Sequence, residues 1–186
     1  KTLDIARQAG VSEALVYRHF ASKLVLYRAV LRQAIREQDI TYRRMALKSS
    51  DTAGIVHMIK TYFTMATSPE HELIQSRFRL LISSLSGDGT YAALIYRRAL
   101  RMIGQTIVEA LHNARAAADI EGRILDSGDT GMFIEHIGTM MSSLCWHRSI
   151  ADPYPSSGDA LIRQAVWFCC RGLGISDVAI ARHIDT

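Results

Sequence analysis

The sequence predicts an all-α protein, with a helix-turn-helix at its N-terminus followed by a larger helical domain. Three observations predict this fold. Apolar residues recur at three- and four-residue steps along most of the 186 residues, which is the spacing of amphipathic helices. The chain has only three prolines and few runs of β-branched residues. Near the N-terminus, Gly10 separates two short helical segments, and glycine readily takes the left-handed conformation of a tight turn.

The first predicted helix begins at Thr2, which can cap it, and carries Asp4 in its first turn, where the helix dipole favours an acid. It stops at Gly10, and Val11 fills the corner of the turn. Its apolar face is predicted to consist of Ile5, Ala6 and Ala9.

The second predicted helix runs from Glu13 to His19, with Ser12 as its N-cap. Leu15 and Val16 are expected to face inward, and Phe20 to close the helix. Two short helices around a glycine-containing turn form a helix-turn-helix, whose second member can lie in the major groove of DNA.

The remaining helices follow from apolar periodicity and from breaks in it. A long helix is predicted from Ser22 to about Lys48, connecting the first motif to the rest of the chain. Ser50 or Asp51 caps the next helix, which extends to about Ala66. Ser68, Pro69 and Glu70 are a cap, a first-turn proline and a first-turn acid, and they start a helix that ends near Leu85.

Turn residues at 87–90 separate that helix from one predicted over Tyr91 to about Ala117, and residues 118–129 form a loop. Asp129 or Thr130 is expected to cap a helix that ends before Asp152-Pro153 and whose inward face includes Phe133. Ser157 or Asp159 opens a helix ending near Gly172, with Phe168 on its inward stripe, and Ser176-Asp177 starts a short final turn.

Charge is unevenly distributed along the chain. Residues 1–48 hold ten Lys or Arg and four Asp or Glu, whereas residues 49–186 hold twelve and fourteen. A basic first part next to an acidic remainder is typical of a nucleic-acid-facing end, although ordinary solvated surface would give the same count. No run of eighteen apolar residues and no signal peptide is present, and three cysteines are an odd number, so we expect a cytoplasmic protein with reduced thiols and no cofactor.

Two runs of residues identify a family resemblance. They are Ile5-Ala6-x-x-Ala9-Gly10-Val11-Ser12 and Val16-Tyr17-x-His19-Phe20-x-Ser22-Lys23. Together they resemble the DNA-binding domain of the TetR family of transcriptional regulators, over about residues 1–30. The resemblance implies a DNA-binding transcriptional regulator, a repressor that a small-molecule effector releases from its operator, and no enzymatic activity.

The sequence departs from the family at two points. Leu24 and Val25 stand where acidic residues usually complete a capping box, so the cap of the third helix depends on the Ser22 hydroxyl. The family also has a helix before this motif, whereas the sequence as given begins at Lys1. We therefore expect the DNA-binding domain over 1–30 to be incomplete as given.

The resemblance and the exposed positions of the second helix together nominate DNA contacts. Glu13, Ala14 and Arg18 are expected to face base edges, because arginine binds guanine at two points and a small side chain can touch a thymine methyl. Contacts to the DNA backbone are expected from Thr2, Ser12, Tyr17, His19 and Lys23. For two of these residues an alternative role is open: Tyr17 could be an aromatic that packs inside the protein, and Lys23 a solvated surface lysine.

In this family, residues 49–186 correspond to an effector-binding and dimerisation domain. The candidate ligand contacts are apolar, aromatic or histidine residues on several helices, and a plain core would have the same composition. The candidates are Met58, Tyr62, Phe63, Phe78, Met102, Ile103, His112, His136, Met140 and Leu144. Their apolar character favours a hydrophobic effector.

The resemblance further implies a homodimer through the last two long helices, bound to a palindromic operator in double-stranded DNA. Gly131, Gly138, Ser142 and Ser143 are small positions where helices could approach closely, within or between subunits. Trp167 lies off the apolar stripe of its helix and is a candidate for a second buried face. Two recognition helices can read half-sites one helical turn or a multiple apart.

Other function classes fit less well. The sequence contains no paired carboxylates, phosphate-binding glycine loop, nucleophile elbow or HExxH motif that would indicate an enzyme. Cys145, His147, Cys169, Cys170 and His136 could gather around a metal, but their spacing matches no common site, so no metal is predicted. A helical ligand-binding or interaction protein that binds no DNA in this form remains the alternative.

Overall fold

The computed structural model describes residues 1–44, 46–68, 72–144 and 154–185, with the side chains at 41–42, 44, 72–75, 102–106 and 143–144 outside the description. The described residues are helical and contain no strand, so the predicted all-α class is confirmed. An isolated β-bridge pairs Ile120 with Ile175. The chain divides into two compact units, which we call the head (Lys1–Thr41) and the body (Tyr42–Thr186).

Two short helices, α1 (Thr2–Gln8) and α2 (Glu13–His19), begin the head, and α3 (Lys23–Arg44) follows them. The helix expected to reach about Lys48 therefore ends earlier, at Arg44. Residues 46–51 leave the helix and form a polar loop, in which the Ser49 hydroxyl donates to Asp51 Oδ1 at 2.6 Å. Serine and aspartate compete with helical hydrogen bonding in this way, which favours a loop over a longer helix.

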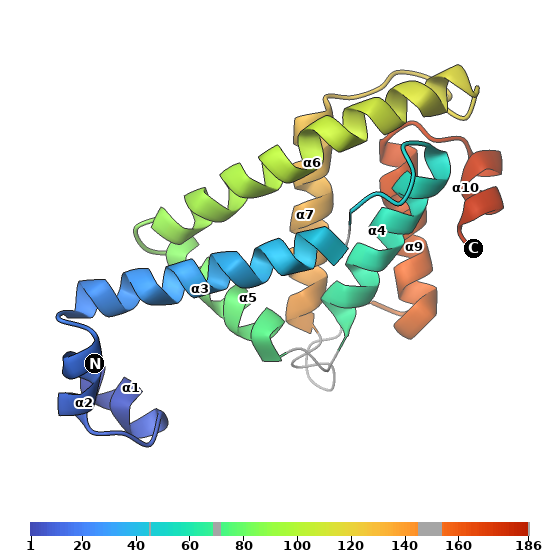
Figure 1. Cartoon of the computed structure of the whole chain (residues 1–186). Coiled ribbons are helices and arrows are strands. Elements are labelled where there is room, and N and C mark those ends of the chain that lie inside the picture. The colour runs from blue at the N-terminus through green and yellow to red at the C-terminus, as the bar shows by residue number, and fades with distance from the viewer. Residues whose placement is uncertain (45, 69–71, 145–153, 186) are drawn as a thin grey trace. The chain divides into compact units, whose positions relative to one another are not determined.

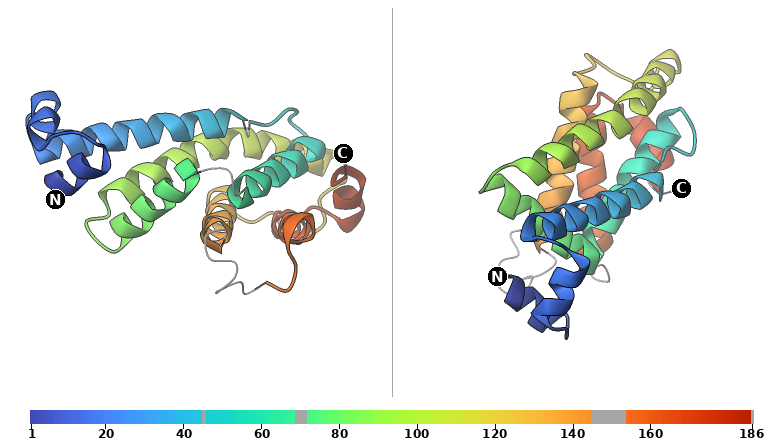
Figure 2. Two further views of the ribbon diagram at one scale, coloured as in Figure 1. Left: turned by 90° about the horizontal axis from the view of Figure 1, so that it is seen from below. Right: turned by 60° about the vertical axis from the view of Figure 1, so that its left-hand side comes forward.

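The body consists of α4 (Thr52–Thr67), α5 (Glu72–Leu85), α6 (Thr90–Ala116), α7 (Ser127–Leu144), α9 (Gly158–Gly172) and α10 (Asp177–His183). Helix α4 packs against both α7 and α9, and α6 crosses α7 (Figure 1, Figure 2). The centre of the core is α4, where Ile55, Val56, Ile59 and Phe63 are at most 1% exposed. Burial of these large apolar side chains is the main stabilising contribution to the body.

Several predicted caps are confirmed. Asp51 Oδ1 accepts from Gly54 N at 2.9 Å at the start of α4, and Ser176 Oγ accepts from Ala179 N at 3.3 Å at the start of α10. Helix α7 begins earlier than the Asp129 or Thr130 cap predicted for it. Asp126 caps it instead, because its carboxylate accepts from the amides of Gly128 at 2.9 Å and Asp129 at 3.0 Å. The predicted breaks at Pro69 and Asp152-Pro153 lie outside the described residues.

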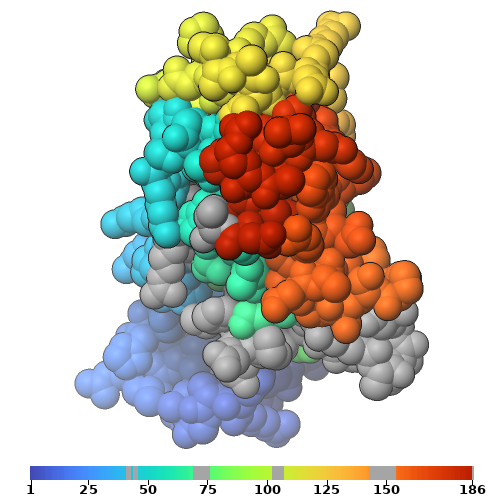
Figure 3. Space-filling view, turned by 90° about the vertical axis from the view of Figure 1, so that its right-hand side faces the viewer, coloured from blue at the N-terminus to red at the C-terminus, as the bar shows by residue number. Residues whose placement is uncertain are grey.

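A polar network ties the end of the chain to the start of α4. The buried carboxylate of Asp119 accepts from the Thr52 hydroxyl at 2.7 Å and pairs with Arg182 of α10 at 3.1 Å. Lys60 Nζ donates to the carbonyl of Ile184 at 2.8 Å. Figure 3 shows α10 and the end of α9 on this face of the body.

Phe133 and Phe168, which were expected on inward faces, lie on the surface instead, and so does the nominated ligand contact Met140. Phe133 and Met140 of α7 are 60% and 55% exposed, and Phe168 of α9 is 68% exposed. Both helices carry apolar residues on more than one face, and periodicity alone does not say which face meets the core. Within the described ranges, no helix combines the length and apolarity needed to cross a bilayer.

Candidate nucleic-acid interface

The turn between α1 and α2 is closed by main-chain geometry. Gly10 has φ of +67°, the left-handed conformation predicted for it. The amide of Val11 donates to the carbonyl of Ala6 at 3.0 Å, which satisfies a carbonyl at the end of α1. The two helices contact each other, and Ala6 and Val16 are buried at 1% and 8% exposure.

Two serines cap the N-termini of the predicted recognition helix, α2, and of the helix that follows it, α3. Ser12 Oγ accepts from Leu15 N at 3.1 Å, which confirms the predicted N-cap of α2. Phe20 is extended, so α2 ends at His19. Ser22 Oγ then accepts from Val25 N at 3.2 Å, and the cap of α3 is formed by this hydroxyl although Leu24 and Val25 follow it.

The residues nominated for DNA contact lie mostly on the surface of α2 and at the start of α3. Ala14, Arg18, His19 and Lys23 are exposed, and Glu13 is half-buried. Tyr17 is 45% exposed, and its hydroxyl donates to Thr2 Oγ1 at 3.3 Å. The arrangement presents cationic and hydroxyl donors next to a helix N-terminus, a combination that suits phosphate.

Some expectations for the head are wrong in detail. Thr2 does not cap α1; Lys1 is the N-cap residue and Thr2 is the first helical residue, 7% exposed. Ile5 and Leu15, expected to face inward, are 46% and 38% exposed, and Val11 at the corner is 37% exposed. In helices of seven residues, periodicity is too short to tell an inner face from an outer one.

The nominated ligand residues of the body do not share one environment. Phe63 is fully buried in the core, Met58 and Tyr62 are partly buried against it, and Phe78 is half-buried. His112, His136 and Met140 are exposed. The side chains of Met102, Ile103 and Leu144 lie outside the description.

Tyr62 and His136 belong to a group of polar and aromatic contacts between helices. The Tyr62 hydroxyl donates to the main-chain carbonyl of Glu135 at 3.0 Å, and its ring lies 5.5 Å from that of Phe63. The His136 ring meets Tyr96 edge-on, with centroids 5.3 Å apart. Gly138 is buried beneath the Tyr62 ring, so this small position serves packing within the body.

Glu135 is a buried acid that the sequence prediction did not single out. It is 9% exposed on α7, and burial raises the pKa of its carboxyl, while the Tyr62 hydrogen bond and the charge of Arg77 act in the opposite direction. A signal was available: Glu135 follows Met132, Phe133 and Ile134, and an acid inside an apolar helical segment is costly unless it is compensated.

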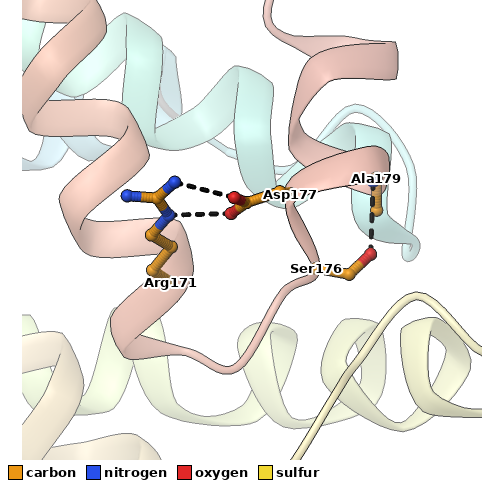
Figure 4. A network of polar contacts seen from close by, with 4 residues as sticks. All are labelled: Arg171, Ser176, Asp177 and Ala179. Atoms are coloured by element: carbon orange, nitrogen blue, oxygen red, sulfur yellow. Dashed lines mark hydrogen bonds and ion pairs between the residues drawn. The ribbon is translucent and has the colours of Figure 1, made fainter.

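An open hollow lies between the ends of α9 and α10, lined by Glu121, Arg171, Gly174, Ile175, Ser176, Asp177 and Val178. None of the nominated ligand residues lines it. Arg171 and Asp177 form a two-point ion pair there, with both N–O distances 2.7 Å (Figure 4). Arg171 also lies 5.0 Å from the ring centroid of Trp167, which is partly buried against the core. The charges of Arg171 and Asp177 are thus matched within the chain.

The two cysteines in the described part of the body, Cys169 and Cys170, are buried free thiols. Burial raises the pKa of Cys169 to about 12 and raises that of Cys170 as well, so both stay protonated at neutral pH. No group of three His, Cys, Asp or Glu side chains gathers around a possible metal position among the residues that the structure describes. Cys145, Trp146 and His147 lie outside those residues.

The family comparison places a match on the head. Residues 1–30 match the family model of bacterial regulatory proteins, tetR family, over α1, α2 and the start of α3. No curated protein and no solved structure matches the sequence.

Proposed function

We propose that this chain is a DNA-binding transcription regulator of the kind found in the tetR family of bacterial regulatory proteins, and that it is a cytoplasmic repressor released from its operator by a small-molecule effector. The observation that carries the proposal is the helix-turn-helix at residues 1–30, whose second helix is exposed along its length except at Val16 and the half-buried Glu13. The balance of basic residues over residues 1–48 supports it, because phosphate contacts dominate affinity for DNA.

Within this proposal, the residues of α2 divide into two roles. Arg18, with Glu13 and Ala14, reads base edges in the major groove. Lys23, His19, Tyr17, Thr2 and the N-terminus of α2 at Ser12 contact the phosphate backbone. In the free chain the Tyr17 hydroxyl donates its one proton to Thr2 Oγ1, so a phosphate contact by Tyr17 would replace this hydrogen bond.

Substitution of Arg18 and Lys23 separates these roles. We expect Lys23→Ala to weaken binding to all DNA sequences and to reduce the slope of log affinity against log salt by about 1 for each chain. Arg18→Ala should instead cost about 1–3 kcal/mol on the preferred site and relax the preference at one or two base pairs. Fluorescence anisotropy with labelled DNA duplexes at several salt concentrations measures both effects.

An exposed basic residue of the body provides the control. Arg123 lies in the loop before α7, and Arg123→Ala also removes one positive charge. An unchanged salt slope for Lys23→Ala, or an equal loss for Arg123→Ala, would remove the phosphate contact from the proposal.

We place the dimer interface on α7 and α9. Phe133, Met140 and Phe168 are large apolar side chains on these helices and are more than half exposed in the single chain. These helices both pack against α4, and their exposed apolar groups favour burial against a second copy. A dimer would present two copies of α2 to a palindromic operator. Size-exclusion chromatography with light scattering should give a dimer that Phe168→Asp weakens, whereas a wild-type monomer at micromolar concentration would contradict it.

A further inference from the structure

Helix α3 carries a row of arginines along one face of the head. Arg28, Arg32 and Arg36 follow one another at four-residue steps, and all three side chains are exposed. At 3.6 residues per turn, this spacing keeps them within about 80° of one another around the helix. The buried residues Leu31 and Ala34 lie on the other side of α3, which Figure 1 draws as one long helix. We call Arg28, Arg32 and Arg36 the arginine stripe.

The acids of α3 do not balance the arginine stripe. Glu37 follows Arg36 by one position, which turns it about 100° away around the helix, and its carboxylate accepts from Gln33 Nε2 at 2.8 Å. Asp39 is the one acid of α3 on the side of the stripe, and it is half-buried. Like charges at four-residue spacing oppose helix formation, and a helix face that meets only water usually mixes its charges. Solvation alone therefore does not account for the stripe.

The arginine stripe matches the chemistry of a nucleic-acid backbone. Its successive arginines lie about 6 Å apart along the helix axis, at about 1.5 Å for each residue. Duplex DNA presents about one negative charge for every 1.7 Å of its axis, so a duplex lying along α3 offers a phosphate to each guanidinium group. Arginine binds phosphate oxygens at two points, whereas lysine binds as a single charge, and all three positions are arginine.

The arginine stripe points away from the proposed phosphate contact on the same helix. Lys23 lies nine residues before Arg32, which is about two and a half turns, so the two side chains project from opposite faces of α3. A duplex in contact with Lys23 therefore approaches α3 from the side opposite to the stripe. We propose that the arginine stripe binds the phosphate backbone of a second stretch of double-stranded DNA, while α2 and Lys23 hold the first.

This inference rests on the proposed function, because the DNA held by α2 supplies the second stretch. Once the first segment is bound, a distant segment of the same molecule is present at a high effective concentration. Three phosphate contacts on each chain then give a weak contact that does not depend on sequence and that salt disrupts. The protein thereby joins two segments of DNA.

Capture of a second duplex by the full chain tests this inference. A short duplex selected by the protein from a random pool is immobilised, loaded with protein at low salt and washed free of unbound protein. A fluorescent duplex of unrelated sequence is then added at several salt concentrations. We expect wild type to capture the second duplex at low salt and to release it as salt rises, while the first duplex stays bound.

Substitution of the arginine stripe tests the site. The triple variant Arg28→Gln, Arg32→Gln and Arg36→Gln should retain the first duplex and weaken capture of the second at least about tenfold. It should also reduce the slope of log affinity against log salt by about 2.7 for each chain, at about 0.9 for each lost phosphate contact.

A matched variant of the body controls for the loss of charge. It combines Arg97→Gln, Arg101→Gln and Arg123→Gln, all at exposed positions, and should capture the second duplex as wild type does. If the triple variant of the stripe fails to hold the first duplex, its three single substitutions are compared instead. Each should lower the salt slope of capture by about 0.9, and slopes equal to that of wild type would reject the site.

The outcomes separate this inference from the proposed function. Normal retention of the selected duplex with no capture of a second one would reject the arginine stripe alone. Equal capture by wild type and the triple variant, or an equal loss in the body variant, would reject it too. Capture of fluorescent polyglutamate as tightly as DNA would overturn the choice of DNA in favour of an acidic protein. Stripe-dependent binding of unrelated duplexes by a protein that enriches no sequence would support the stripe and contradict operator binding.

Discussion

Gly138 of α7 lies directly against the ring of Tyr62 and leaves no room there for a larger side chain. A Cβ at this residue would lie 2.2 Å from Cε1 of Tyr62 and 2.5 Å from both Cζ and the hydroxyl oxygen. Ordinary contact begins near 3.4 Å, so Gly138→Ala must displace the Tyr62 ring by more than 1 Å. That displacement breaks the 3.0 Å hydrogen bond from Tyr62 to the carbonyl of Glu135.

The expected cost follows from three contributions. Overpacking costs about 1–3 kcal/mol, and the lost hydrogen bond costs about 1 kcal/mol. Alanine inside a helix gains about 1 kcal/mol over glycine. We therefore expect Gly138→Ala to lower the free energy of unfolding by about 1–3 kcal/mol.

Urea denaturation of the full chain at a fixed protein concentration measures this cost, because any dimerisation makes stability depend on concentration. Gly172→Ala is the matched control: Gly172 is also helical, and a Cβ there meets nothing within 4 Å. We expect the control to be neutral or slightly stabilising. In a Tyr62→Ala background the cost of Gly138→Ala should disappear. If Gly138→Ala and Gly172→Ala behave alike, the packing of Tyr62 on Gly138 is refuted.

Two further predictions concern the caps and the buried acid. Ser12→Ala removes the acceptor of the Leu15 amide and should destabilise α2 by about 1 kcal/mol. Hydrogen exchange should show this as faster exchange of the α2 amides. Ser83→Ala, at an exposed helical site, is the control and should leave the exchange of those amides unchanged. Because folding raises the pKa of Glu135 above its ordinary 4.5, the folded chain binds more protons there than the unfolded chain, and stability falls as pH rises above about 4.5. Urea midpoints from pH 4.5 to 7.5 should therefore fall for wild type relative to Glu135→Gln, and parallel curves would show that Glu135 titrates normally.

Local chemistry explains which parts of the fold were predictable. The caps at Ser12, Asp51 and Ser176 each depend on a side chain and an amide three residues later, so the sequence alone indicates them. The start of α7 was misplaced because Asp126, Asp129 and Thr130 are all good caps. Which of the three residues caps α7 depends on where the chain leaves the loop before the helix, and tertiary contacts determine that point.

Faces and pairings between helices could not be predicted in the same way. Phe133 and Phe168 are as apolar as core residues, and only the packing of α4 against α7 and α9 shows that they face outward. The placement of Glu135 beside Tyr62 and Tyr96 joins residues far apart in the sequence. Periodicity carries no information about such neighbours.

The central claim, that the chain is a DNA-binding regulator, is tested most directly by selecting bound duplexes from a random pool with the full-length protein at low salt. We expect enrichment of a palindromic site whose half-sites lie one helical turn or a multiple apart, with binding that weakens steeply as salt rises. Failure to retain any duplex at low salt, or retention without enrichment of a sequence, would contradict the account.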